Sequence, residues 1–213
     1  MDKIKIPRYS LGEELINSIS HGVGAVFAII YLILMLLKAN TAIEYVTVTI
    51  FGTSMILLYT MSCIYHALSP KLTGKKVLRV LDHCNVYLLV LGTYIPITLL
   101  GVRGTLGWGL FTLVLTITII GITLSSIAMD KLQIFEVICH LINGWSILLG
   151  VKYLYQNMGL YGVVFAILGG VMYTVGSILY GIGSNKKYFH SIFHFFCLFG
   201  TFFHFIAIYL YLL

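Results

Sequence analysis

The sequence predicts an all-α integral membrane protein with seven transmembrane helices, and two observations support this prediction. Of the 213 residues, 60% are hydrophobic and only 9% are charged, whereas a soluble domain carries about 25% charged residues. The hydrophobic residues also fall into runs of about 20, the length that spans the hydrocarbon core of a bilayer. We therefore expect one domain over residues 1–213, with residues 1–16 as a short cytoplasmic segment.

Seven runs along the chain have the length expected of a membrane-spanning helix. Short polar or glycine-containing breaks separate them, around residues 38–40, 69–71, 101–104, 130–131, 156–157 and 183–185. The charged residues 1–16 contain no apolar core, so we expect no cleaved signal peptide. The predicted helices cover residues 17–37, 43–68, 81–100, 106–128, 135–155, 160–182 and 189–213.

The distribution of lysine and arginine predicts the orientation of this bundle, because cytoplasmic segments of membrane proteins carry an excess of both. With the amino terminus inside, the outer loops carry only Lys38, Arg103 and Lys152. We therefore expect a cytoplasmic amino terminus, a carboxyl terminus outside, and no nucleic-acid partner despite the net charge of +6. The inner segments carry Lys3, Lys5, Arg8, Lys71, Lys75, Lys76, Arg79, Lys131, Lys186 and Lys187.

Three histidines mark the ends of two of these runs. His190 and His194 are four residues apart, so they share one face of the last predicted helix. His66 closes the second predicted helix on the same side of the membrane. Together they supply three nitrogen ligands, the number that leaves a catalytic zinc one position for water. Because polar groups at membrane depth are costly, we expect these three residues to bind Zn²⁺.

Further polar residues are predicted to lie at the depth of the histidines. Glu14, Asn17 and His21 are three and four residues apart, on one face of the first helix. With Arg79, they form an expected polar cluster that supports the metal site. Since helices one, three and seven all run outward in this orientation, residues scattered over the chain converge in the inner leaflet.

Asp82 and Ser62 are the candidate catalytic residues. Asp82 is expected one turn into the third helix, where it would hold a zinc-bound water or bind zinc directly. A simpler interpretation is an ion pair with Arg79, three residues earlier. Ser62 lies one turn deeper than His66 on nearly the same face. Its simpler interpretation is a hydrogen bond to its own backbone.

Other polar residues are interpreted as structural. A lone helix histidine is more often a hydrogen-bonded core residue, and we interpret His140 and His204 in this way. His204 lies ten residues beyond His194, roughly 15 Å along the helix, too far to share an ion. We expect His83 to point away from the site and Glu136 to be a charge at the inner membrane interface.

Four ordered motifs resemble those of the hemolysin III family, which belongs with the progestin and adipoQ receptors and, more distantly, the alkaline ceramidases. The resemblance implies seven helices with the amino terminus inside and a zinc ion on three histidines. It also implies an aspartate that holds the zinc-bound water and a serine near the site, matching Asp82 and Ser62. The compact chain suits the bacterial branch of the family, so we expect the protein to lie in a bacterial plasma membrane. The motifs are Glu14-x-x-Asn17-x-x-x-His21-Gly22, Ser62-x-x-x-His66, Arg79-x-x-Asp82-His83 and His190-x-x-x-His194.

Three classes of function follow from these expectations. The first is an intramembrane zinc hydrolase of lipid amides or esters, with a membrane lipid as substrate. The second is a pore-forming cytolysin, which the family name suggests, although the sequence shows no amphipathic pore segment. The third is a membrane sensor or receptor with a structural zinc. The sequence leaves the lipid substrate and the oligomeric state open.

Overall fold

The computed structural model describes residues 4–183 and 186–213, apart from the side chains of residues 129, 130 and 133, and every element in these ranges is helical. Lys3 of the predicted inner charges and residues 184–185 of the last predicted break lie outside the described residues. The elements are α1 (Leu11–Lys38), α2 (Ala42–Ala67), α3 (Thr73–Pro96), η1 (Ile97–Val102), α4 (Gly104–Trp145), η2 (Ser146–Gly150), α5 (Val151–Gly183) and α6 (Phe189–Tyr211).

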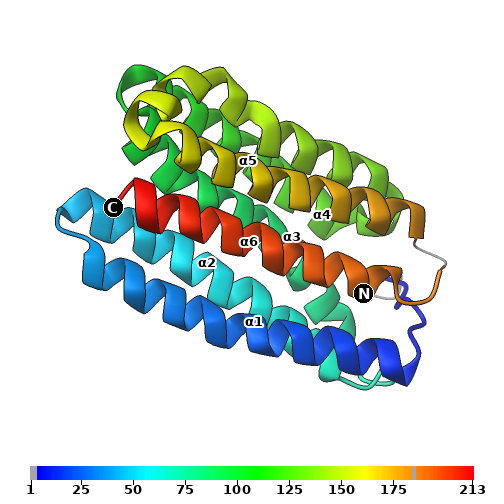
Figure 1. Ribbon diagram of the computed structural model, residues 1–213. Helices are drawn as coiled ribbons and strands as arrows, with labels where there is room; N and C mark the ends of the chain where they lie inside the picture. The colour runs from blue at the N-terminus through cyan, green and yellow to red at the C-terminus, as the bar shows by residue number, and fades with distance from the viewer. Residues whose placement is uncertain (1–3, 184–185) are drawn as a thin grey trace.

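The helices lie side by side in an elongated bundle (Figure 1). Within the described residues, six helical stretches are long and apolar enough to cross a membrane. The chain is therefore an all-helical integral membrane protein. The six stretches are Leu11–Lys38, Ala42–Ala67, Thr73–Val102, Gly104–Ala128, Ile134–Ile182 and Phe189–Tyr211.

The stretch Ile134–Ile182 is not one straight helix. Its 49 residues would extend about 73 Å, more than twice the hydrocarbon thickness of a bilayer. Near its middle, Gly159 has φ 68° and ψ −177°, outside the helical region. Nε1 of Trp145 donates a hydrogen bond of 3.0 Å to Oγ1 of Thr174, although these residues lie 29 positions apart. The chain therefore reverses at Gly159, close to the predicted break at residues 156–157.

A second irregularity divides α4 into two arms. Ala128 has φ −144° and ψ 33°, so the helix is interrupted two residues before the predicted break. On one side of this kink, Ser126 lies 3.6 Å from the sulfur of Cys84. On the other side, Glu136 contacts His83, the neighbour of Cys84 on α3. Both arms of α4 therefore pack against the same part of α3.

Two helices, α1 and α3, begin several residues before the starts predicted from their apolar runs. α1 starts at Leu11 because Ser10 and Glu13 form a capping box: each side chain bonds the other's backbone N–H. α3 starts at Thr73, eight residues before the predicted start, because its first turns carry polar side chains that find partners inside the protein. Asp82 is therefore more than two turns inside α3, and the expectation that it lies one turn in is wrong.

The packing brings four helix ends together. α1 packs along α2, α2 along α3, and α5 along α6, while α6 also contacts α1. The beginnings of α1, α3 and α6 and the end of α2 meet at one end of the bundle, which we call the histidine end. Figure 1 shows that the described chain begins at this end and finishes at the opposite one.

Candidate metal centre

Three histidines from two helices meet at the histidine end. His66 lies in the last turn of α2, while His190 and His194 lie one turn apart at the start of α6. Nε2 of His190 lies 3.3 Å from Nε2 of His66 and 3.0 Å from Nε2 of His194. His66 and His194 are only 2% and 1% exposed. The structure thus brings together the three predicted ligands.

The spacing of these nitrogens fits a metal ion. One ligand atom from each of the three residues lies within 4.8 Å of the other two. Zinc–nitrogen bonds of 2.0–2.1 Å in a tetrahedron place two nitrogens roughly 3.3 Å apart. Three neutral imidazoles whose ring nitrogens face one point cannot all satisfy one another, because each carries a single N–H. A cation at that point satisfies all three lone pairs, so the cluster can hold a metal.

A partly buried carboxylate orients the first of these histidines. Oε2 of Glu14 lies 2.6 Å from Nδ1 of His66, so Nδ1 donates and Nε2 presents its lone pair to the cluster. Oε1 of Glu14 accepts a hydrogen bond of 2.5 Å from Nζ of Lys75. Lys75 is fully buried and also donates to the carbonyl of Leu68 at 2.8 Å. A carboxylate behind a metal-binding histidine fixes its tautomer and ring orientation.

Asn17 and His21 of α1 also reach this centre, as the motif spacing predicts. Nδ2 of Asn17 lies 3.5 Å from Nδ1 of His66. The ring of His21 stacks on that of His194, with centroids 3.7 Å apart and 17° between the planes. Asn17 and His21 are both buried, so the first turns of α1 form one wall of the centre.

The amino-terminal segment covers the centre at the histidine end. The ring of Tyr9 stacks on His190, with centroids 5.0 Å apart and 18° between the planes. Arg79, which is buried, donates from Nη1 to the carbonyl oxygen of Lys5. Burial raises the pKa of the Tyr9 hydroxyl above its ordinary value, so this group stays neutral. Arg79 thus anchors the segment that carries Tyr9.

Ser62 and Asp82 line a cavity beside the histidines. The Ser62 hydroxyl is buried and faces the Asp82 carboxylate, yet among the described residues it has no partner in hydrogen-bond geometry. The alternative in which Ser62 bonds its own backbone is therefore wrong. A buried hydroxyl at the wall of a cavity, beside a carboxylate, is suited to donate to a bound ligand.

The cavity extends from the histidines into the bundle, between α3, α4, α5 and α6. Asp82 of α3 lines its polar end, and Ile97, the first residue of η1, lines it farther along. These two residues are 15 positions apart, which corresponds to about 22 Å along a helix axis. Most of the side chains that line it beyond the histidines are apolar. The cavity is therefore polar at the histidine end and mostly apolar beyond it.

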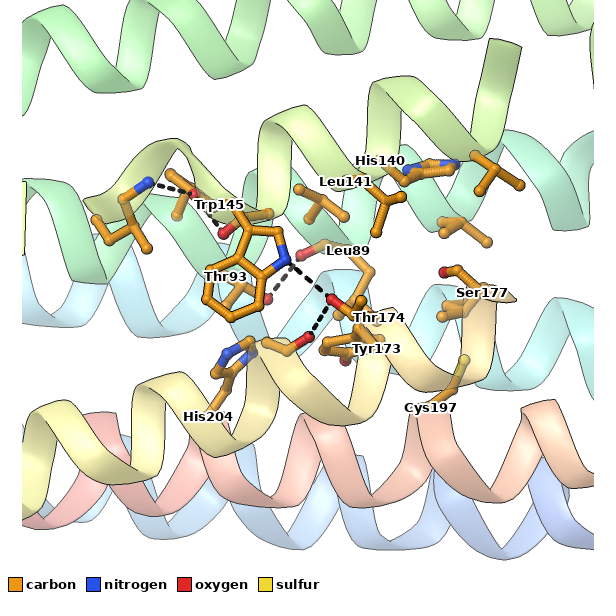
Figure 2. A pocket seen from close by; sticks show the side chains of 18 of the residues that line it. Leu89, Thr93, His140, Leu141, Trp145, Tyr173, Thr174, Ser177, Cys197 and His204 are labelled. Carbon is orange, nitrogen blue, oxygen red and sulfur yellow. Dashed lines mark hydrogen bonds between the residues drawn. The ribbon is translucent and has the colours of Figure 1, made fainter. Parts of the chain in front are cut away.

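Figure 2 shows the middle of this cavity, where polar contacts tie its walls together. His140 points in from α4, and Cys197 and His204 approach from α6. Trp145 reaches across to Thr174 through the hydrogen bond described above. Nε2 of His204 lies 3.1 Å from the carbonyl oxygen of Ala166, so its interpretation as a hydrogen-bonded core residue is confirmed.

Sequence comparison places the chain among known proteins. A sequence model described as Haemolysin-III related matches residues 9–205. The chain belongs to the hemolysin III family. Hemolysin-3 of Bacillus cereus is 36% identical over 205 residues, which cover 94% of this chain and 92% of that protein. A Hemolysin-3 homolog of Bacillus subtilis (strain 168) is 34% identical over 196 residues, 91% of each chain.

The match to the hemolysin III family confirms the resemblance inferred from the four motifs, and it spans every predicted site residue from Glu14 to His194. Two residues of the centre were not predicted. The sequence predicts Lys75 only as a charge in a loop, because a lysine just before an apolar run is typical of a membrane boundary. Tyr9 lies in a segment without periodicity, so no pattern in the sequence places it on His190.

Proposed function

We propose that this hemolysin III protein is an intramembrane zinc hydrolase that cleaves an amide or ester of a membrane lipid. The observation that carries the proposal is one cavity with His190, His194, Asp82 and Ser62 at one end, beside His66 of the cluster, and a mostly apolar wall beyond them. An acyl chain in the cavity would bring its carbonyl carbon to the polar end. Positioning of this kind accounts for a large share of enzymatic rate enhancement.

The residues of the centre have separate roles in this proposal. Zinc, if held by His66, His190 and His194, would supply the Lewis acidity that turns a water into a nucleophile at neutral pH. Asp82 accepts the proton of the attacking water and returns it to the leaving nitrogen or oxygen. Ser62 donates a hydrogen bond to the carbonyl oxygen as negative charge develops there. The water oxygen bonds to the acyl carbon, the C–N or C–O bond breaks, and a fatty acid leaves.

The test uses purified protein in lipid with a panel of ceramide-like and glycerolipid substrates. We expect the wild type to release fatty acid and the His190→Ala variant to release none. Asp82→Asn should keep its zinc but lose turnover, and Ser62→Ala should lower turnover by about 10²-fold, as for other single oxyanion donors. If the wild type releases no more fatty acid than His190→Ala, a sensor with a structural zinc becomes the better interpretation.

We also propose seven membrane spans with the amino terminus in the cytoplasm. The reversal at Gly159 supports a division of Ile134–Ile182 into two spans. The two chain ends at opposite ends of the bundle support an odd number of crossings. Lys71, Lys131 and Lys186 belong to the group of basic residues that favours the histidine end as the cytoplasmic one.

A further inference from the structure

A second group of polar side chains lies beside the cavity, where both arms of α4 meet α3. On the second arm of α4, the polar residues Glu136, His140 and Asn143 are four and three positions apart, so they lie on one face of the helix. We call the whole group the polar seam. It consists of His83 and Tyr87 of α3, Ser125 of the first arm of α4, and Glu136, His140 and Asn143 of the second arm.

Four residues of the polar seam are buried: the exposed fraction is 0% for Tyr87 and Asn143, 1% for Ser125 and 6% for Glu136. The expectation that Glu136 is an interface charge is therefore wrong. Within the described residues, several atoms of the seam have no hydrogen-bond partner. They are the hydroxyls of Tyr87 and Ser125, Oε1 of Glu136, Nδ1 of His140 and both side-chain polar atoms of Asn143.

These side chains nevertheless lie close to one another. Nδ1 of His83 is 3.2 Å from Oε2 of Glu136. The rings of Tyr87 and His140 have centroids 4.0 Å apart. The Ser125 hydroxyl faces both Tyr87 and Glu136 without reaching hydrogen-bond geometry. The seam is thus a set of converging donors and acceptors that the protein alone leaves unmatched.

Water is the ligand that this chemistry favours. Buried polar groups without partners are costly, most of all at membrane depth, and buried waters typically bridge about three such groups. A second metal ion is disfavoured because, within the described ranges, only His66, His190 and His194 form a group with metal-ligand spacing. The single carboxylate of the seam, Glu136, is already bonded to His83.

We propose that the polar seam holds a chain of water molecules that delivers reactant water to Asp82. Glu136, His140 and His83 line the same cavity as Asp82, and His83 is its neighbour on α3. The Tyr9 segment covers the histidines at their own end of the bundle, so water needs another polar route. This proposal rests on the proposed hydrolysis, which consumes one water in each turnover.

The chain offers a matched pair of tyrosines for a test on the unmodified protein. Tyr87 and Tyr59 are 0% and 1% exposed, but the Tyr59 hydroxyl is hydrogen-bonded to Thr201, at 2.5 Å. X-ray pulses convert bound water into hydroxyl radicals that oxidise adjacent side chains, and mass spectrometry locates the products. In lipid nanodiscs we expect several-fold more oxidation of Tyr87 than of Tyr59. Equal oxidation of the two would overturn the water chain.

A pair of variants links the water to the reaction. Ser125→Val removes a hydroxyl of the seam, whereas Thr123→Val removes one from the exposed face of the same helix. We expect only Ser125→Val to lower both Tyr87 oxidation and turnover several-fold, with bound zinc unchanged. If the protein hydrolyses lipid but Tyr87 is not oxidised, the water chain is refuted and the proposed function is supported. If Tyr87 is oxidised but no lipid is hydrolysed, the proposed function is refuted and the presence of the water chain is supported.

Discussion

The role of a single histidine in this protein depends on what its two ring nitrogens meet. One ring nitrogen of His66 is hydrogen-bonded to Glu14, and the other faces the cluster. His190 and His194 face the same cluster. His204, on the same helix as these two, instead contacts a backbone carbonyl. The four histidines therefore divide into three candidate ligands and one residue that is hydrogen-bonded in the core.

The first prediction follows from this division. Replacement of His190 or His194 with alanine should abolish stoichiometric zinc in the purified protein, because two nitrogens cannot complete the site. His204→Ala is the matched control, since it removes a partly buried histidine from α6 without touching the cluster. Zinc per chain is measured by elemental mass spectrometry. Zinc that stays bound in both His190→Ala and His194→Ala would refute the metal assignment.

The sequence alone could predict much of the centre, and the reason is local geometry. Spacings of three and four residues on a helix place Glu14, Asn17 and His21 on one face whatever the rest of the fold does. The partners of these residues depend on how helices pack, which spacing does not encode. The structure was therefore needed to find Lys75 behind Glu14 and Tyr9 on His190.

At the level of the helices, apolar runs predicted where the elements lie and several of their ends, but not the polar starts of α1 and α3. α2 and α6 begin within one residue of their predicted starts, because charged or turn-forming residues flank them directly. α3 begins eight residues before its apolar run, because Lys75 and Arg79 are buried and find partners inside the protein. A hydropathy pattern assigns such polar residues to a loop, so it does not detect a helix that begins with them.

The second prediction concerns the reversal between the two halves of Ile134–Ile182. Gly159 has φ 68° and ψ −177°, a conformation that is essentially restricted to glycine. Gly159→Ala should therefore destabilise the protein by about 1–3 kcal/mol. Gly181→Ala is the control, because Gly181 is in the helix and a Cβ there meets no atom within 4 Å. Thermal unfolding in detergent measures both, and equal melting temperatures would contradict this account.

In the whole molecule, the bundle places its costly polar groups where they support one another. Residues of the histidine cluster and of the polar seam line one cavity, and mostly apolar side chains of the surrounding helices form the rest of its wall. Charges outside this region, such as Lys38 and Glu44, lie at the opposite helix ends, where they form caps or backbone contacts. Charged residues are thus distributed unequally between the two ends of the bundle, and this asymmetry bears on the orientation of the protein in the membrane.

The last prediction is the topology in the membrane. Seven spans put the chain ends on opposite sides, whereas six would put them on the same side. A reporter fused after Leu213 should therefore appear outside the cell, and tags placed at residues 71–76 should stay in the cytoplasm. Protease protection in inside-out and right-side-out vesicles distinguishes the two locations. A cytoplasmic carboxyl terminus would remove one span, and Ile134–Ile182 would then have to form a single crossing with a re-entrant arm.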